Sequence, residues 1–254
     1  MTSVDNIAIQ LYTVRELAAE DFEGTLKTIA DIGYKAVELA GFYGNSAEEI
    51  RAITDGLGLK VASAHIGVAD FEADLGKVVS DLQTLGADWG VIPWISPDNR
   101  TEKALRAYGD QFNGYADTFA GAGLKFGYHN HDFEFKVKAE DGTSLFEMLL
   151  AVTDPTKVFF ELDAYWVSVG GLDPADVLAR HKDRIKLVHL KDGFQNNLVA
   201  GADVPFGEGD LDFDTFFAAA AEAGVEYYVT EQDTRKDVVP EITKSFNNAK
   251  KVLG

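Results

Sequence analysis

The chain has 254 residues, 46% of them hydrophobic and 26% charged, which fits one large globular domain over residues 1–254. Its 42 acidic and 23 basic side chains give a formal net charge of −19, so nucleic acid and anionic membranes are poor partners. The sequence has no cysteine, which excludes disulfides and thiolate metal sites.

The N-terminal segment MTSVDNIAIQLYTVRE does not contain a basic leader followed by an apolar core. No run in the chain approaches the roughly 18 apolar residues that are needed to cross a bilayer. We therefore expect a cytoplasmic protein without a membrane partner.

A short β-rich run followed by an amphipathic stretch recurs eight times along the chain. The predicted strands are Ile7–Tyr12, Ala36–Ala40, Val61–Ile66, Trp89–Pro93, Phe126–His131, Val158–Asp163, Ile185–Lys191 and Tyr227–Gln232. The helical patterns between them cover Phe22–Ile32, Ala47–Leu57, Leu75–Leu85, Lys103–Ala122, Pro174–Arg180, Phe213–Ala223 and Glu241–Leu253. Alternating units of this kind indicate a parallel sheet.

Glycines follow five of these helical patterns, at the positions where left-handed helix caps are expected: Gly33, Gly58, Gly86, Gly123 and Gly224. The first strand is not followed by a Gly-x-Gly-x-x-Gly motif, which disfavours a dinucleotide-binding fold. Eight alternating units without a linker therefore predict a single (β/α)8 TIM barrel.

Barrels of this kind place their active sites at the carboxyl ends of the strands, where this sequence is rich in polar and aromatic side chains. The candidates are Gln10, Tyr12, Glu38, His65, Trp94, His129, His131, Glu134, Asp163, Trp166, His189, Lys191 and Glu231. Among them, we expect His65, Trp94, His129, His131, Trp166 and Lys191 to contact a substrate.

Strand parity tests which of these side chains can point into the barrel together, because successive residues of a strand face opposite sides. Inward positions then include Phe159, Glu161 and Asp163 on the sixth strand, Ile185, Leu187, His189 and Lys191 on the seventh, and Tyr227, Val229 and Glu231 on the eighth. With this assignment, apolar residues occupy both the inward-facing and the helix-facing positions of these strands, so Asp163, His189 and Glu231 can all point into the interior.

Two alternatives remain open from the residues alone. The pair His129 and His131 has an H-x-H spacing that puts both imidazoles on one face, where they could bind a metal themselves. Glu161 is as inward-facing as Asp163, and we expect it to pair with a lysine or with the network of Glu38 deeper in the barrel.

Five ordered motifs, GYHNHDFEF, FELDAYW, LVHLKDG, GEGDLDF and VTEQD, resemble the sugar phosphate isomerase/epimerase family with its xylose isomerase-like TIM barrel. The segments IQLYTVRE and GYKAVELAGFYG are similar to the same family, so the resemblance covers nearly the whole chain.

In ketose 3-epimerases of this superfamily, two glutamates, an aspartate and a histidine hold a divalent metal, and both glutamates do acid/base work. The resemblance carries these roles onto Glu134 in HDFE, Asp163 in ELD, His189 in VHLKD and Glu231 in VTEQ. Three carboxylates and one imidazole suit Mn²⁺ best, with Mg²⁺, Co²⁺ or Zn²⁺ as alternatives.

This chain departs from those epimerases in two places. Trp166 stands where they have a histidine three residues after the metal aspartate, and Lys191 lies just beyond the metal histidine. The family also includes dehydratases and lyases, so the resemblance defines the fold and the metal better than the reaction.

The implied chemistry is isomerisation or epimerisation of a keto sugar or related polyol ketone through an enediolate, with Glu134 and Glu231 as the acid/base pair. An alternative is β-elimination by a lyase or dehydratase acting on a 3-keto-glycoside or an inosose. A non-enzymatic sugar- or metal-binding module is a further alternative. Abasic-site DNA repair is disfavoured because five histidines and a net charge of −19 do not suit a three-zinc, DNA-binding enzyme.

We expect the small carbohydrate substrate not to be phosphorylated. Phosphate sites in such barrels usually use glycine-rich loops after the seventh and eighth strands. Here the seventh loop contains Gly207-Glu208-Gly209-Asp210, and the eighth sets Arg235 and Lys236 beside Asp233 and Asp237.

Overall fold

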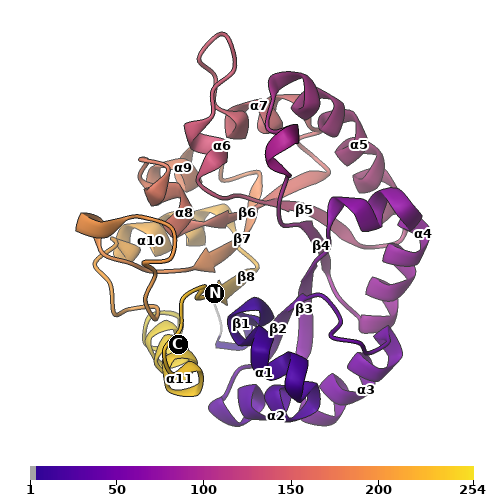
Figure 1. Ribbon diagram of the computed structural model, residues 1–254, viewed down its shortest axis with the longest axis vertical. Helices are drawn as coiled ribbons and strands as arrows, with labels where there is room; N and C mark the ends of the chain where they lie inside the picture. Colours follow the sequence, from indigo (N-terminus) through magenta and orange to yellow (C-terminus); the bar gives the residue numbers. More distant parts are fainter. Residues whose placement is uncertain (1–3) are drawn as a thin grey trace.

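The computed structural model describes residues 4–254 and contains eight parallel strands in a closed barrel, ordered β1 to β8 around the ring. Figure 1 shows the helices arranged around the outside of the strands. The strands are β1 (Ile7–Gln10), β2 (Ala36–Ala40), β3 (Lys60–His65), β4 (Trp89–Ile92), β5 (Lys125–His129), β6 (Val158–Asp163), β7 (Ile185–Leu190) and β8 (Tyr227–Thr230). The predicted barrel is confirmed, and most strands begin or end within two residues of their predicted limits.

The α-helices are α1 (Arg15–Glu20), α2 (Phe22–Ile32), α3 (Ala47–Leu57), α4 (Val68–Leu85), α5 (Glu102–Gly121), α6 (Phe133–Lys136), α7 (Leu145–Val152), α8 (Ala164–Val169), α9 (Pro174–Arg180), α10 (Phe213–Ala223) and α11 (Val238–Leu253). Short 3₁₀ turns are η1 (Val4–Asn6), η2 (Leu11–Val14), η3 (Pro97–Asn99) and η4 (Gln195–Asn197). All of the predicted helices are present, and α1, α6, α7 and α8 are additional. Among residues 4–254, no helix is both long and apolar enough to cross a membrane.

Three of the five predicted helix-ending glycines are left-handed caps, whereas Gly33 caps α2 with a φ of 122° and α5 is capped by Ala122, one residue before Gly123. Gly58, Gly86 and Gly224 cap α3, α4 and α10 in the left-handed region, with φ of 66°, 65° and 67°. Residues with a side chain rarely adopt this conformation, whereas glycine does so readily, so each helix stops at its glycine and the chain turns into the next strand.

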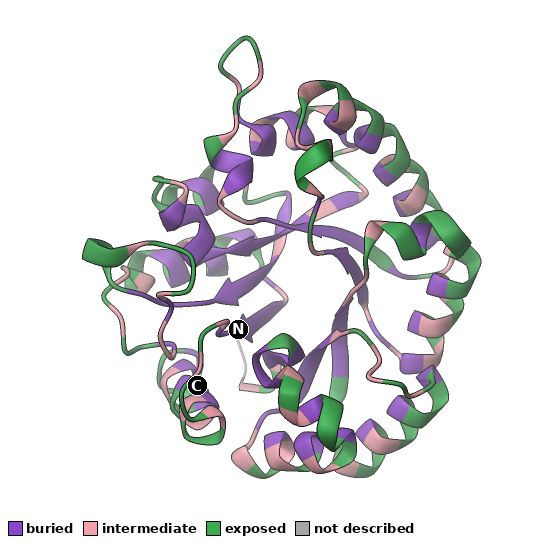
Figure 2. Ribbon diagram, in the orientation of Figure 1, coloured by how far each residue is buried: buried purple, intermediate pink, exposed green. Residues whose placement is uncertain are grey.

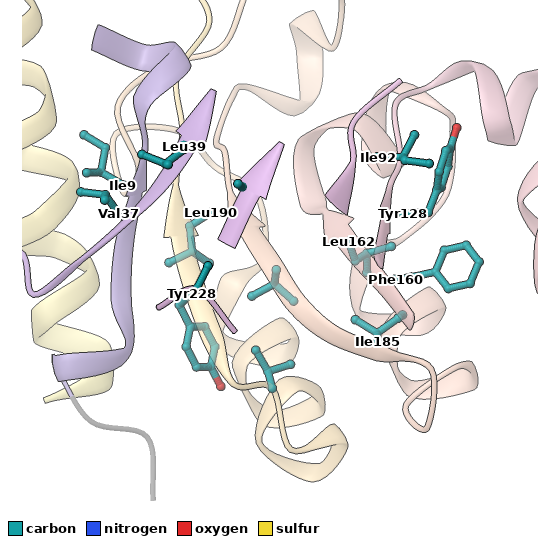
Figure 3. Close-up of a cluster of buried hydrophobic side chains, with 14 of the residues drawn as sticks. Ile9, Val37, Leu39, Ile92, Tyr128, Phe160, Leu162, Ile185, Leu190 and Tyr228 are labelled. Carbon is teal, nitrogen blue, oxygen red and sulfur yellow. The ribbon is translucent and has the colours of Figure 1, made fainter. Parts of the chain in front are cut away.

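The barrel has two apolar layers, one between strands and helices and one inside the ring. Figure 3 shows part of the first, in which Val37, Phe160, Leu162 and Ile185 point away from the barrel axis. The interior layer contains Ala8, Ala36, Ala62, Trp89, Val91, Leu187, Tyr227 and Val229, packed with Phe159. Figure 2 shows the strands as buried and the outward helix faces as exposed. Buried charged side chains such as Glu161, Asp163 and His189 lie nearer the carboxyl ends of the strands.

The predicted inward orientation of Ile185 is wrong, because Ile185 packs in the helix-facing layer together with Phe160. The register between β6 and β7 shifts at this point: Phe160 pairs with Ile185, but Glu161 pairs with Leu187. Lys186 is the extra residue of this irregularity, and it breaks the alternation. Leu187 and His189 still face the interior as predicted.

Candidate metal centre

A cavity of about 600 Å³ opens at the carboxyl ends of the strands. Its wall contains every residue that the sequence predicts to contact a substrate: His65, Trp94, His129, His131, Trp166 and Lys191. Further lining residues are Tyr12, Arg15, Ala40, Pro93, Ala200, Gly201, Glu231 and Asp233. Their roles as substrate contacts remain predictions, although their shared location agrees with that role.

Four side chains, two of which line this cavity, form a group whose ligand atoms all lie within 4.8 Å of one another: His129, Asp163, His189 and Glu231. We call these residues the outer group. All four are buried, and they come from β5, β6, β7 and the end of β8. Two imidazoles and two carboxylates are a donor set that suits a divalent transition metal.

Asp163 joins the outer group because it is both the last residue of β6 and the N-cap of α8. Its Oδ1 atom accepts a hydrogen bond of 2.9 Å from the backbone N–H of Trp166, which fixes the side chain at the helix start. Its buried Oδ2 atom has no hydrogen-bond partner among residues 4–254. Burial raises the pKa of this carboxyl to about 6. This oxygen forms an ion pair of 3.3 Å with Lys191 Nζ but makes no hydrogen bond, so it can take a metal ion in place of the ammonium.

Lys191 brings a positive charge to the same place. Its Nζ atom lies 2.9 Å from Glu231 Oε2, 2.9 Å from Asp233 Oδ2 and 3.3 Å from Asp163 Oδ2. Burial alone would raise the pKa of Glu231, but Lys191 and His189 outweigh it and hold that pKa well below its ordinary value. Glu231 is therefore ionised at neutral pH.

His189 connects the outer group to a second set of side chains deeper in the barrel. Its Nδ1 atom lies 2.8 Å from Glu231 Oε2 and 3.9 Å from Asp163 Oδ2. Its Nε2 atom lies 2.8 Å from Glu38 Oε2 and 3.1 Å from Glu161 Oε2. A carboxylate that binds one ring nitrogen of a histidine fixes the orientation in which the other can reach a metal.

Glu161 is the centre of this deeper set, which we call the inner group: His65, His129, Glu161 and His189. A single carboxylate oxygen, Oε2, lies 2.7 Å from His65 Nε2 and 3.0 Å from His129 Nδ1, besides its contact with His189. Burial would raise the pKa of Glu161, but His189 and His65 hold it well below its ordinary value. As expected, Glu161 pairs within the network of Glu38.

Glu38 closes the inner network from the opposite side of the barrel. Its carboxylate accepts hydrogen bonds from Gln10 Nε2 at 2.6 Å and from Ser63 Oγ at 2.5 Å. Burial, followed by the charge of Glu161, raises the pKa of Glu38. Both oxygens of Glu38 are thus hydrogen-bonded, which offsets the desolvation cost of burying them, whereas Glu161 Oε1 makes no hydrogen bond within residues 4–254.

The inner and outer groups differ in how well they could accept a cation. Inner donor atoms already contact one another at 2.7–3.1 Å through Glu161 Oε2, and these distances are hydrogen bonds. The outer group includes the 3.9 Å separation between His189 Nδ1 and Asp163 Oδ2, and the latter makes no hydrogen bond within the described chain. Within residues 4–254, each group keeps one carboxylate oxygen that makes no hydrogen bond, Glu161 Oε1 in the inner group and Asp163 Oδ2 in the outer group. We take the outer group as the metal site because it offers two carboxylates against one.

Glu134 lies outside both groups of possible ligands among residues 4–254, and His129 completes the outer group. The Glu134 carboxylate accepts a hydrogen bond from Tyr128 Oη at 2.6 Å and another from the backbone N–H of His131 at 2.8 Å. Burial raises the pKa of Glu134 to about 7. Its predicted role as a metal ligand and acid/base group is thus not tested by the arrangement and stays a prediction.

His131 and two tryptophans form the aromatic side of the cavity. The His131 ring lies 5.4 Å from the Trp166 ring, and His131 Nδ1 has no hydrogen-bond partner within residues 4–254. Burial lowers the pKa of His131 well below its ordinary value, so the ring is neutral at pH 7. Trp94 is 45% exposed at the rim and lies under the guanidinium of Arg100, 5.1 Å from the ring centre.

The structure thus brings Asp163, His189 and Glu231 together as predicted and adds His129 to them. Asp233 was missed as a site residue, although its spacing of two from Glu231 could have indicated a shared face. The pairing of Glu161 with the network of Glu38 was expected, but the hydrogen bonds that Gln10 and Ser63 donate to Glu38 could not be read from one sequence, since these residues lie on three different strands.

Comparison with known proteins gives relatives along most of the chain. An inosose dehydratase from Geobacillus kaustophilus is 25% identical over 248 residues, covering 82% of this chain and 79% of the relative. Two crystal structures of sugar phosphate isomerase/epimerases from Parabacteroides distasonis superimpose well. One is 26% identical with a TM-score of 0.84, covering 97% of this chain and 93% of the other. The second is 25% identical with a TM-score of 0.81, covering 95% and 96%.

The model of one protein family matches residues 26–249, which include seven of the eight strands and all of the outer group. The family is described as the xylose isomerase-like TIM barrel. This match, the closed eight-stranded barrel and the buried group of histidines and carboxylates agree with one another. The chain therefore belongs to the xylose isomerase-like TIM barrel family.

Proposed function

We propose that this protein is a metal-dependent lyase that eliminates water or another leaving group from the carbon β to a ketone. The substrate is a small polyol ketone such as an inosose, or a 3-keto-glycoside. Mn²⁺ is our first choice of metal, held by Asp163, His189 and Glu231 together with His129.

The observation that carries this proposal is the one-sided distribution of acid/base groups. Epimerisation by two opposed glutamates needs both at the metal, yet only Glu231 belongs to the outer group. Both oxygens of Glu134 accept hydrogen bonds, from Tyr128 and from the backbone of His131. His131 lines the cavity, and its buried Nδ1 atom has no hydrogen-bond partner among residues 4–254, so we take this neutral imidazole as a proton-transfer group of another kind.

Elimination needs a base for the proton α to the ketone, a stabiliser for the enolate and an acid for the leaving group. When bound, the divalent metal supplies Lewis-acid polarisation of the ketone oxygen. The His131 imidazole takes the proton from the α-carbon, and the electron pair of the broken C–H bond forms the new double bond as the β C–O bond breaks. The protonated His131 then gives this proton to the departing oxygen, which leaves as water or an alcohol, so no oxidant or reductant is needed. Lys191 adds positive charge beside the developing oxyanion.

The loops after β7 and β8 support a substrate without a phosphate group. Asp192 Oδ2 accepts hydrogen bonds from the backbone N–H groups of Gly207 at 2.9 Å and Gly209 at 3.0 Å. Asp203 Oδ2 similarly accepts from Asp233 N at 2.6 Å and Thr234 N at 3.1 Å. The backbone donors with which such loops bind phosphate are thus already paired with carboxylates of this chain.

The curated relatives favour elimination as well. The Geobacillus kaustophilus protein that covers most of this chain is an inosose dehydratase, and its identity of 25% leaves room for a different ketone in the same kind of reaction.

The test is to incubate chelator-treated protein, with and without Mn²⁺, with an inosose and with 3-keto-glycosides in deuterated water. We expect an unsaturated ketone that absorbs in the ultraviolet and, from the glycosides, a released alcohol, only when metal is added. Protein that binds Mn²⁺ but forms no unsaturated product from any of these substrates would contradict the proposal.

Isomerisation or epimerisation is the second candidate, with Glu134 and Glu231 as the acid/base pair. It is favoured by the pKa of about 7 that burial gives to Glu134, because a group with this pKa can both accept and return a proton at neutral pH. The same experiment separates the two reactions. Deuterium incorporation at carbon without an unsaturated product, using keto sugars, would favour isomerisation. Metal and ligand binding without either change would favour a binding module.

A further inference from the structure

We propose that Lys191 is a built-in cation that shares its anionic partners with the metal ion, and that metal binding moves its ammonium group from Asp163 and Glu231 to Asp233. This inference rests on the metal site of the proposed function. It concerns how the metal is loaded, whichever reaction follows.

The competition arises because both cations use the same oxygen atoms. Lys191 Nζ lies 2.9 Å from Glu231 Oε2 and 3.3 Å from Asp163 Oδ2. Those atoms face His189 Nδ1 in the outer group, at 2.8 Å and 3.9 Å respectively. Lys191 is only 1% exposed, so little water screens its charge from a metal ion bound to the same oxygens. The two positive charges therefore disfavour each other at this position.

Asp233 provides the place to which the ammonium can turn. Its Oδ2 atom already lies 2.9 Å from Lys191 Nζ, and its side chain is more exposed than those of Asp163 and Glu231. The backbone N–H of Asp233 donates to Asp203 Oδ2 at 2.6 Å, which holds the residue in position at the cavity wall. Lys191 can therefore leave the metal ligands and keep a charged partner.

The movement of the Lys191 ammonium group would also change the charge that the cavity presents to a substrate. Lys191 and Asp233 both line the cavity, and the ammonium lies 5.3 Å from the centre of the Trp166 ring. An ammonium group released from Asp163 and Glu231 becomes available to a negatively polarised oxygen of the substrate. Metal loading and substrate recognition are then coupled through one side chain.

The test measures Mn²⁺ affinity by calorimetry on chelator-treated wild-type protein, Lys191→Met, Asp233→Asn and the double variant. Coupling between two sites typically changes an affinity by about 5- to 150-fold. We expect Lys191→Met to bind Mn²⁺ at least about tenfold more tightly than wild type, because the competing charge is gone. Asp233→Asn should bind about tenfold more weakly, because the ammonium has lost its alternative partner.

The double variant separates this exchange from a simple effect of charge. Asp233→Asn removes a negative charge near the metal, and a direct effect of that charge would persist without Lys191. In the Lys191→Met background, we expect Asp233→Asn to change the Mn²⁺ affinity by less than about twofold, since the two residues act through one contact. An unchanged or weaker affinity of Lys191→Met, or an Asp233→Asn effect that persists in the double variant, would overturn the proposal.

Two further variants control for packing and folding. Lys191→Gln keeps a hydrogen-bonding group without the charge, and we expect it to bind Mn²⁺ more tightly, as Lys191→Met does. Lys186→Met removes another lysine of β7, whose Nζ donates to Ala223 O at 2.7 Å, and should leave the affinity unchanged. If every variant bound Mn²⁺ as tightly as wild type, this inference would be refuted, but the proposed lyase function would still stand. Failure of wild type and all variants to bind a divalent metal would refute both proposals.

Discussion

Glu38 Oε2 of β2 lies 2.8 Å from His189 Nε2 of β7, although these strands are not neighbours in the ring. The contact crosses the barrel interior and orients the imidazole so that Nδ1 faces Glu231 and Asp163. Burial alone would lower the pKa of His189, but Glu161, Glu231 and Glu38 raise it well above its ordinary value. The metal-ligand candidates are thus positioned by charges from the opposite wall.

Glu161→Gln tests whether the inner group supports the fold. One oxygen of Glu161 contacts His65, His129 and His189, so neutralising it removes an anionic partner from three buried imidazoles at once. Breaking a buried ion pair typically costs about 3–5 kcal/mol, and we expect the free energy of unfolding in urea to fall by about that amount. As a control, Glu147→Gln removes a more exposed contact with His181 and should cost less than about 1 kcal/mol. Equal costs for the two variants would contradict a central role for Glu161.

Asp163→Asn tests the outer group with little change in structure. The remaining side-chain oxygen can still accept the 2.9 Å hydrogen bond from Trp166 N and cap α8. We expect Mn²⁺ affinity to fall by at least about 100-fold, since even outer-shell partners of a metal contribute about 10- to 100-fold. Asp173→Asn, at the N-cap of α9, is the matched control and should bind Mn²⁺ as wild type does. Retained affinity in Asp163→Asn would place the metal elsewhere.

His131→Ala tests the proposed proton transfer. Because positioned acid/base groups contribute about 100- to 10,000-fold, we expect kcat for elimination to fall by that factor while Mn²⁺ affinity is kept. His181→Ala removes another partly buried histidine, one that contacts Glu147, and should leave kcat unchanged. A variant that eliminates at the wild-type rate would exclude His131 as the proton-transfer group.

Glu134→Gln tests the elevated pKa through stability in metal-free buffer. Burial raises the pKa of Glu134 from 4.5 to about 7, so the folded state binds a proton more tightly than the unfolded state. Wild type should therefore lose stability relative to the variant as pH rises from about 4.5 to 7, with no further loss above that range. Since one pKa unit is worth about 1.4 kcal/mol, the relative loss should be on the order of 3 kcal/mol. Parallel pH curves for the two proteins would contradict the elevated pKa.

Asp192→Ala tests why the loop after β7 does not suit phosphate. The substitution frees the backbone N–H groups of Gly193, Gly207 and Gly209, which now donate to Asp192. We expect the variant to bind inorganic phosphate in the millimolar range, measurable by calorimetry, whereas wild type does not. Stability should also fall by about 1–3 kcal/mol, the usual cost of leaving buried donors unpaired. Phosphate binding by wild type would show that the carboxylate does not occupy the loop.

Much of the fold could be predicted because its signals are local. Each strand and helix can be recognised from a short stretch of sequence, by its pattern of apolar residues and by helix-ending glycines such as Gly58 and Gly86. The same strand-helix unit then recurs along the chain. Helix α8 was missed because all six of its residues are buried, which removes the polar face that marks a surface helix.

The site was harder to predict because its residues meet only after the ring has closed. Motif order identified Asp163, His189 and Glu231, which the structure brings together. His129 joins them at the end of β5, and one sequence cannot say which of two histidines in H-x-H lies deeper. The exchange of partners between Lys191, Asp163 and Asp233 depends on distances of a few ångströms, which spacing along the chain does not encode.

The extra residue Lys186 changes which side chains of β7 point toward the barrel axis. Below it, Ile185 pairs with Phe160 and packs against the helices, and above it Leu187, His189 and Lys191 turn toward the axis. A similar shift between β2 and β3 sets Glu38 opposite Ser63. Each irregularity changes the orientation of the side chains only in the part of the strand that follows it. The polar side chains near the carboxyl ends can therefore take their orientation without any change in the packing of the residues before the irregularity.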